Sequence, residues 1–508
     1  MRDAGRFRQF PSLANRSYRA NCTRVVMSGP AKTSATASVS NVSNGTSNLK
    51  DVTKLAQVLD LDLQEKNLSP AERNAAVGQL KLFTRKLEDA GPLLTEEGIR
   101  ILSRHGFDSA PTIASRDALR CLANLFLLDP KARQIFVDLK FADKAAERLK
   151  NDNRDDEFLV SRILFLMTYD TNLNFDGLFE HHQLSESINK NIAHLSNFYS
   201  VSRPRKERSP STLDTLALSE TLKLLFNLTQ YYPHRSPSFT PSLAHILKIL
   251  CRLDLPSPAL RPPVNYLINA LLNLDIVNEN DPSNSTSNPF FPAFDPKCNA
   301  ERLIHILDNT VRDHNHQEED LERTAPPLIS LLRKVFDSAP ASVKIHMQTR
   351  LLPTDDERSL ALGRSPSLAS HLLRLSTSAV APNLRETISQ LLFDLSDRDA
   401  TTFVRNVGYG FASGFLMTHD FPVPAAALRG EDLGEMVTTV DGREINPVTG
   451  QRRDMEPEGE EAEMTEEEKE REAERLFVLF ERLKATGVVD VQNPVAQAAQ
   501  EGRFEEVD

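Results

Sequence analysis

The sequence lacks the residues on which several classes of protein depend. Its 508 residues include no Trp and only four cysteines, none in a CxxC pair: Cys22, Cys121, Cys251 and Cys298. Cysteines so far apart predict buried, reduced thiols rather than disulfides or a zinc site. No apolar run approaches the roughly 18–20 residues of a membrane span. The formal net charge of −11 argues against a general nucleic-acid binder.

Catalytic signatures are missing as well. The chain contains no P-loop, HExxH or GxSxG motif and no paired metal-ligand motif. The polar run DHNHQEED at 313–320 is expected to be a loop, with a metal site as the alternative. We therefore expect no metal, no cofactor and no bond-making chemistry.

Residues 1–50 form a basic leader. They contain six Arg and a single acid, Asp3, and then become rich in Ser, Thr and Asn. This composition resembles a mitochondrial transit peptide. The interpretation that we favour is a disordered basic leader, or a start upstream of the true one at Met27.

Beyond the leader, the stretch 115–139 has a clear helical pattern. It predicts a helix, a break at Asp129-Pro130 and a second helix. One apolar helical face is spaced at i, i+3, i+4, i+7 and i+8, and consists of Leu119, Leu122, Ala123, Phe126 and Leu127. Ser69-Pro70 predicts another helix start, with Ser69 as the N-cap.

Similar helices recur with a period. When they are superposed on Asn124, Leu166, Asn227 and Asn269, the steps are 42, 61 and 42 residues. The long step holds an insertion of about 20 residues, which we place in a surface segment at 170–212. A period near 42 with two or three helices per unit is typical of armadillo and HEAT repeats. We predict an all-α, armadillo/HEAT-like solenoid over 51–425.

The superposition also defines a candidate binding face. Asn124, Asn227 and Asn269 share one position, and the cations Arg120, Arg162 and Lys223 lie four residues before it in three units. Side-chain amides can hold the backbone of a bound peptide or helix, and cations favour an acidic segment. The alternative is that the three Asn only hydrogen-bond to neighbouring repeats.

The last third of the chain departs from the repeats. Gly408, Gly410 and Gly414 give a GxGxxxG spacing, which predicts a close helix contact or a turn rather than a dinucleotide site, because no strand precedes it. Residues 426–508 are expected to form a flexible, partly disordered acidic tail, with eleven Glu in 456–475.

An amphipathic helix is predicted within this tail, at about 465–485. Thr465 and Glu468 can form a capping box, and an apolar stripe comes next at Leu476, Phe477, Leu479, Phe480 and Leu483. The helix either folds back on the solenoid or docks on a partner.

Six stretches carry a family resemblance. In chain order they are CLANLFLLDPKARQIFVDL, RILFLMTYDT, LKLLFNLT, VGYGFASGFLM, INPVTG and MTEEEKEREAERL. Together they resemble the synembryn family, the "resistance to inhibitors of cholinesterase" proteins that act on heterotrimeric G-protein α subunits (Gα). The resemblance runs from about Asp51 to Leu483, and INPVTG followed by MTEEEKE is its most specific part.

This resemblance implies an armadillo/HEAT-like solenoid with guanine-nucleotide exchange activity on Gα and chaperone activity on nascent Gα. It implies that the concave face takes the C-terminal helix of Gα, through Arg120, Asn124, Phe165 and Asn227. The tail helix would contact the Gα nucleotide-binding domain through Phe477, Phe480 and Leu483. Animal members carry an acidic Ser/Thr-rich kinase segment before INPVTG. This chain has only Thr438 and Thr439 there, which leaves Thr465 as a candidate phosphosite.

An armadillo adaptor of the nuclear-import kind is the alternative. Such receptors resemble this chain in their Asn rows but pair them with Trp, and this chain has none. We expect instead a monomeric cytoplasmic protein, found also at the inner face of the plasma membrane, that binds Gα in its GDP-bound or nucleotide-free form.

Overall fold

The computed structural model describes residues 44–199, 210–276, 288–313, 318–422, 442–446 and 448–456, together with positions 471 and 475. The chain divides into two units, Met1–Gln451 and Arg452–Asp508. The first unit holds the repeats. In the second, the described residues include one short 3-10 turn, η6 (Arg453–Met455). Phe477, Phe480, Leu483 and Thr465 lie outside the described residues, so their predicted roles stay predictions.

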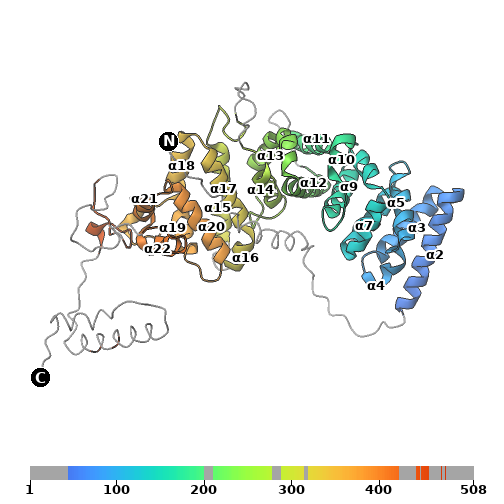
Figure 1. Ribbon diagram of the computed structural model, residues 1–508, viewed down its shortest axis with the longest axis horizontal. Helices are drawn as coiled ribbons and strands as arrows, with labels where there is room; N and C mark the ends of the chain where they lie inside the picture. Colours follow the sequence, from blue (N-terminus) through green and yellow to red (C-terminus); the bar gives the residue numbers. More distant parts are fainter. Residues whose placement is uncertain are drawn as a thin grey trace, which may run out of the picture. The chain divides into compact units, whose positions relative to one another are not determined.

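The first unit is a stack of helices in two layers, which follow one another along its length in sequence order (Figure 1). Layer 1 is a row in which each helix packs on the next: α3 (Pro70–Phe83), α6 (Ile113–Leu128), α9 (Arg154–Met167), α12 (Thr212–Tyr231), α14 (Val264–Asn273), α17 (Pro326–Ser338) and α20 (Pro382–Leu395). Because Asn124, Leu166, Asn227 and Asn269 lie on four successive helices of this row, the period predicted from the sequence corresponds to physical repeats.

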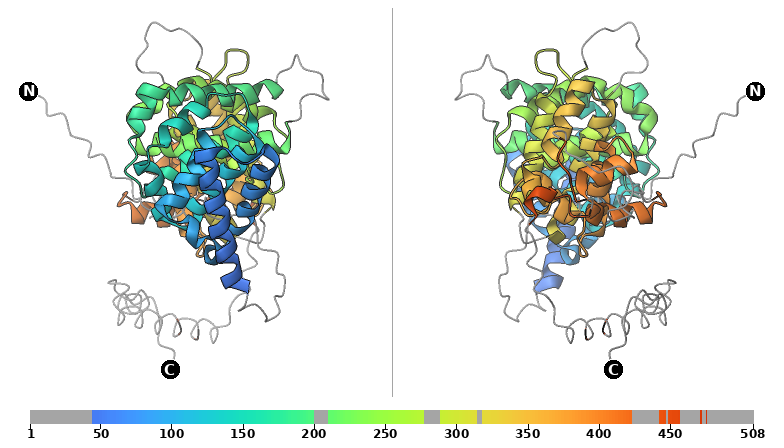
Figure 2. Two further views of the ribbon diagram at one scale, coloured as in Figure 1. Left: turned by 90° about the vertical axis from the view of Figure 1, so that its right-hand side faces the viewer. Right: turned by 90° about the vertical axis from the view of Figure 1, so that its left-hand side faces the viewer.

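Layer 2 covers one side of that row, and the end-on views show helices of successive repeats behind one another (Figure 2). Its members are α2 (Asn44–Glu65), α5 (Glu96–Phe107), α7 (Pro130–Asp138), α8 (Ala142–Arg148), α10 (Phe175–His182), α11 (Leu184–Ser196), α13 (Thr240–Arg252), α15 (Cys298–Asp313), α18 (Ala341–Leu351) and α19 (Leu368–Leu375). The remaining helical pieces are α4 (Leu87–Ala90), α16 (Glu318–Thr324), α21 (Ala400–Val407), α22 (Tyr409–Thr418), η1 (Gly91–Leu93), η2 (Asn197–Tyr199), η4 (Pro233–Phe239) and η5 (Glu357–Ser359). The predicted all-α repeat solenoid is confirmed.

Local sequence signals set the helix boundaries. Ser69 caps α3 in a capping box with Glu72, and Pro70 occupies the first turn, as the sequence predicts. Asp129 caps α7 by accepting a hydrogen bond from Lys131 N at 2.9 Å, with Pro130 after it. The apolar face of α6 is buried except for Leu127, which is 37% exposed and does not belong to the core.

The predicted surface insertion at 170–212 is wrong for most of its length. Helices α10 and α11 occupy 175–196, and their apolar residues, such as Leu178 and Ile188, are fully buried. The polar residues between these apolar positions obscured a helical spacing that still places one face in the core. Gln183, in a left-handed conformation, makes the turn between the two helices.

Basic side chains join neighbouring helices, within one repeat or between repeats, by capping the carboxyl ends of helices. The Arg133 guanidinium donates to Phe126 O at the end of α6. The Lys334 amino group donates to Leu272 O at 2.8 Å and Leu274 O at 2.6 Å, at the end of α14. These carbonyls have no partner within their own helix, and a cation suits the negative end of the helix dipole.

The two glycine-containing motifs of the C-terminal third lie against each other. Gly408, at a φ of +81°, begins α22, and Gly410 N donates to Val448 O at 3.0 Å. A Cβ at Gly408 would come within 3.0 Å of the same oxygen. These glycines therefore permit a turn and a close backbone approach, as predicted.

Residues 442–446 and 448–451, which we call the strap, lie beyond the predicted end of the solenoid at 425 and are part of the first unit. The strap is held by a buried guanidinium. Arg358 donates to Gly450 O at 3.0 Å and also to Arg405 O and Asn406 O at the end of α21. Leu362 N donates to Thr449 O, and Ile445 is buried. The described residues of INPVTG, 445–446 and 448–450, thus pack against the last repeats.

Candidate functional site

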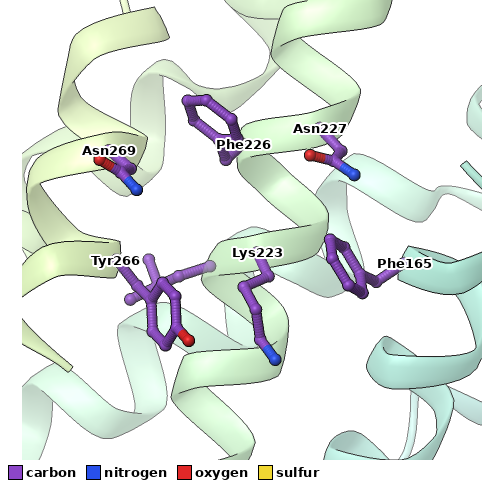
Figure 3. A pocket seen from close by; sticks show the side chains of 7 residues that line it. Phe165, Lys223, Phe226, Asn227, Tyr266 and Asn269 are labelled. Atoms are coloured by element: carbon purple, nitrogen blue, oxygen red, sulfur yellow. The ribbon is translucent and has the colours of Figure 1, made fainter. Parts of the chain in front are cut away.

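Layer 1 carries an open hollow where α9, α12 and α14 meet. It encloses about 220 Å³ of empty space, which includes adjoining solvent. Seven residues line it: Phe165, Leu222, Lys223, Phe226, Asn227, Tyr266 and Asn269 (Figure 3). Four of them, Phe165, Lys223, Asn227 and Asn269, are predicted binding residues, and the fold brings these four together.

Helical spacing explains why these residues meet. Lys223 and Asn227 are four apart on α12, and Tyr266 and Asn269 are three apart on α14, so each pair shares a face. Neighbouring helices of the row then place these faces side by side. The α12 helix begins at a capping box between Ser211 and Asp214, which fixes its register.

The Lys223 ammonium lies between two aromatic rings (Figure 3). Its Nζ is 5.3 Å from the centre of the Phe165 ring and 5.4 Å from that of Tyr266, which are distances suited to cation–π attraction. It donates to Glu220 Oε1 at 2.6 Å. Burial lowers the pKa of Lys223, and the Glu220 carboxylate partly opposes that shift. Lys223 thus links three helices of the row.

Two of the three aligned amides bond to the preceding repeat. Asn227 Nδ2 donates to Thr168 Oγ1 at 2.7 Å, and Asn124 Nδ2 donates to Thr84 Oγ1 at 3.2 Å. Thr168 and Thr84 are the C-cap residues of α9 and α3. These bonds match the alternative in which the Asn residues connect repeats.

Asn269 differs from the other two. Its side chain lines the hollow and is partly exposed, and the part of the chain that the structure describes offers its amide no hydrogen-bond partner. An amide that can both donate and accept is suited to the backbone of a bound segment.

Arg120 and Asn124 lie on α6, away from the hollow, and Arg162 is outside its lining as well. The predicted cations are not isolated. Arg120 bonds to Asp117 and Asp155 at 2.9 and 2.6 Å, and Lys81 bonds to Asp117 at 2.8 Å. Arg162 lies 3.8 Å from Glu220. Each cation of the row is therefore accompanied by a carboxylate, which weakens its attraction for an acidic segment.

Sequence reasoning missed three residues of the hollow, namely Leu222, Phe226 and Tyr266. The sequence pattern places Leu222 and Phe226 on the buried face of α12, and they are buried, but both also reach the hollow. Tyr266 lies one helical turn before Asn269 on the same face, and that spacing could have identified it.

Over the described ranges, neither the cysteines nor the clusters of polar side chains add a further site; Cys22 and residues 314–317 of the polar run lie outside those ranges. Cys121, Cys251 and Cys298 are unpaired, and Cys121 is fully buried, which raises its thiol pKa to about 12. Among the described residues, no group of His, Cys, Asp and Glu is placed to hold a metal ion. A search of the same residues found no helix with the length and apolar character of a membrane span.

Comparison with known proteins decides the family. The sequence profile described as guanine nucleotide exchange factor synembryn matches residues 76–503. The chain belongs to the synembryn family. The resemblance inferred from the six sequence stretches is thereby confirmed.

Synembryn relatives are similar over different lengths of the chain. A chaperone Ric-8A of Xenopus tropicalis is 26% identical, over 87% of this chain and 86% of its own length. The chaperone Ric-8A of Gallus gallus is 24% identical, over 86% and 85%. A synembryn-like chaperone of Schizosaccharomyces pombe is 31% identical over 189 residues, which cover 36% of this chain and 35% of its own.

The synembryn family is thus one of guanine nucleotide exchange factors and chaperones. Membership of this family favours an exchange and chaperone role over the role of a nuclear-import adaptor.

Proposed function

We propose that this protein is a guanine-nucleotide exchange factor and folding chaperone for Gα, and that layer 1 holds the C-terminal helix of Gα over the hollow. The observation that carries the proposal is the convergence of Phe165, Lys223, Asn227 and Asn269 on one open hollow. The profile match to an exchange factor and the chaperone names of the relatives support it.

The lining suits a helix terminus. Phe165, Phe226 and Tyr266 provide apolar and aromatic surface for a side chain that leaves water. The Asn269 amide can bond to backbone groups that have no partner at the end of a helix. Arg120 and Asn124, on α6 next to α9 in the row, would contact the part of the Gα helix closer to its own domain.

Exchange then needs no catalytic side chain. A factor that binds nucleotide-free Gα more tightly than GDP-bound Gα shifts the population towards the nucleotide-free form. Withdrawal of the C-terminal helix from the Gα core would loosen the contacts around the guanine. GTP binding would restore that core and release the factor. Shielding of the same helix during synthesis is a chaperone activity.

The tail and the cellular setting complete the proposal. The predicted tail helix would contact the Gα nucleotide-binding domain through Phe477, Phe480 and Leu483, with Thr465 as a candidate phosphosite. The protein would act as a monomer in the cytoplasm and at the inner face of the plasma membrane.

The proposal is tested by the rate of GDP release from purified Gα, with and without the full-length protein. We expect release to accelerate with protein concentration and to saturate when one molecule is bound to each Gα. No acceleration with any fungal or animal Gα would refute the exchange part. The chaperone part would then be judged by the yield of active Gα in a translation extract depleted of endogenous chaperone and supplied with this protein.

A further inference from the structure

Glu220 lies beneath the hollow and holds the only charged residue of its lining. Its side chain is on α12, three residues before Lys223, and only 6% of the residue is exposed. Oε1 accepts the bond from Lys223 Nζ at 2.6 Å, and the Arg162 guanidinium on α9 lies 3.8 Å away. Oε2 is buried without a hydrogen-bond partner in the described part of the chain. The carboxylate therefore depends strongly on Lys223.

The Lys223 ammonium is in turn held in place by groups of this protein. It is bonded to Glu220 and lies against the Phe165 and Tyr266 rings, and its side chain is only 12% exposed. A partner carboxylate that drew Lys223 away would leave the buried, half-satisfied carboxylate of Glu220 with only the Arg162 guanidinium, 3.8 Å away and without a hydrogen bond to it. A carboxylate that approached while Lys223 stayed in place would meet the like charge of Glu220.

We propose that Glu220 is a positioning residue that sets the charge preference of the hollow: by holding Lys223, it makes the hollow accept an uncharged apolar side chain of the partner helix and reject a carboxylate. This inference rests on the proposed function and replaces the sequence-based expectation that the cation row attracts an acidic segment. The apolar side chain lies among Phe165, Phe226 and Tyr266, and the Asn269 amide bonds to the backbone next to it.

The test uses synthetic peptides of the Gα C-terminal helix and the full-length protein. Each apolar residue of the peptide is replaced in turn by Glu and, as a matched control, by Gln, so that each pair differs in charge at nearly constant size. Affinities are measured by fluorescence anisotropy. At one position we expect the Glu peptide to bind the wild-type protein at least ten times more weakly than the Gln peptide, a factor that corresponds to about 1.4 kcal/mol.

Two variants separate the charge effect from folding. In Glu220→Gln, Lys223 is no longer held by a carboxylate. At that peptide position we then expect the Glu peptide to bind as tightly as the Gln peptide, or more tightly. In Lys223→Met the carboxylate of Glu220 remains, and the penalty should persist or grow. Thermal melting of each variant shows whether it is folded. If Glu220→Gln does not fold, Glu220→Leu takes its place in the same comparison, because only removal of the Glu220 carboxylate separates its effect from the desolvation of a charged peptide side chain.

The outcomes distinguish this inference from the proposed function. Peptides that bind the wild-type protein without any charge penalty, or a penalty that Glu220→Gln leaves unchanged, overturn the inference and leave the proposed function standing. If no Gα peptide binds the wild-type protein, the proposed binding mode fails and the inference fails with it.

Discussion

The Asn227 side-chain amide donates a hydrogen bond to the Thr168 hydroxyl at 2.7 Å, and this bond joins α12 to the C-cap of α9. Asn124 and Thr84 repeat the arrangement two helices earlier in the row, between α6 and the C-cap of α3, at 3.2 Å. The same side-chain type at the same repeat position thus connects successive repeats of the stack.

Asn227→Ala should destabilise the stack. Asn227 is 4% exposed, and its loss removes the donor to the half-buried Thr168 hydroxyl, so we expect a cost of about 1 kcal/mol. Asn124→Ala should cost less, because Asn124 is partly exposed. Urea unfolding followed by circular dichroism measures both. If the variants lose stability but bind Gα as the wild type does, Asn124 and Asn227 serve the stack and have no direct role in binding.

Gly450→Ala should release the strap. Gly450 has a φ of +68°, and an added Cβ would lie 2.4 Å from Leu362 Cδ1. Gly442→Ala is the matched control, because Gly442 also has a positive φ but no atom within 4 Å of such a Cβ. Both variants carry backbone strain of about 1–2 kcal/mol, and only Gly450→Ala adds a clash.

The rates of amide hydrogen exchange show whether the strap stays in place. The amides of Leu362 and Gly410 donate to Thr449 O and Val448 O, so they should exchange faster in Gly450→Ala than in Gly442→Ala. Equal exchange at these two amides in both variants would show that the strap tolerates the extra methyl group.

Stability of the first repeat should fall in mild acid because of His105. This side chain is 4% exposed and its Nε2 lies 3.0 Å from Leu59 O on α2. Burial lowers its pKa below the ordinary value of 6.5, so the unfolded chain binds a proton that the folded chain does not. The contribution of His105 to the free energy of unfolding is therefore present above pH 6.5 and is lost as the pH falls towards the lowered pKa.

The pH effect is measured by urea unfolding at pH 7.5 and pH 5.5. One proton accounts for a slope of at most about 1.4 kcal/mol per pH unit. The His105→Gln variant cannot take up this proton and should show a smaller loss of stability between the two pH values. Equal losses in the variant and the wild type would assign the effect to other groups.

Deletion of residues 456–508 should separate two activities. If the tail contacts the nucleotide-binding domain while layer 1 holds the C-terminal helix, the truncated protein should bind an isolated Gα C-terminal peptide with nearly unchanged affinity. It should accelerate GDP release much less than the full chain does. Equal loss of peptide binding and of GDP release would mean that the tail and the solenoid do not have these separate roles.

The sequence predicts the repeats well, because burial of one helical face imposes a spacing that can be read directly. The same spacing places Lys223, Asn227 and Asn269 on one surface, and the family resemblance adds Phe165 to them. It says less about pairing, because the periodicity locates a face without stating which groups meet across it. The Glu220–Lys223 bond and the bond from Asn227 to Thr168 are contacts that the periodicity does not predict.

Contacts distant in sequence are harder still to predict. The strap meets Leu362 and Arg358 after an intervening stretch of about 90 residues, and no periodic signal connects such segments. The helices α10 and α11 escaped prediction for a different reason, because their many polar residues make a half-buried helical pattern resemble a surface segment.

The most direct test of the account is the affinity of Gα for the Asn269→Ala variant. Because the Asn269 amide has no partner among the described residues, its removal should leave the melting temperature unchanged. If the hollow holds the Gα C-terminal helix, loss of this hydrogen bond should weaken binding roughly 5- to 10-fold, or about 1 kcal/mol. Asn309→Ala, on α15 and away from the hollow, is the control. Unchanged affinity in Asn269→Ala would contradict the proposal that the hollow is the binding site.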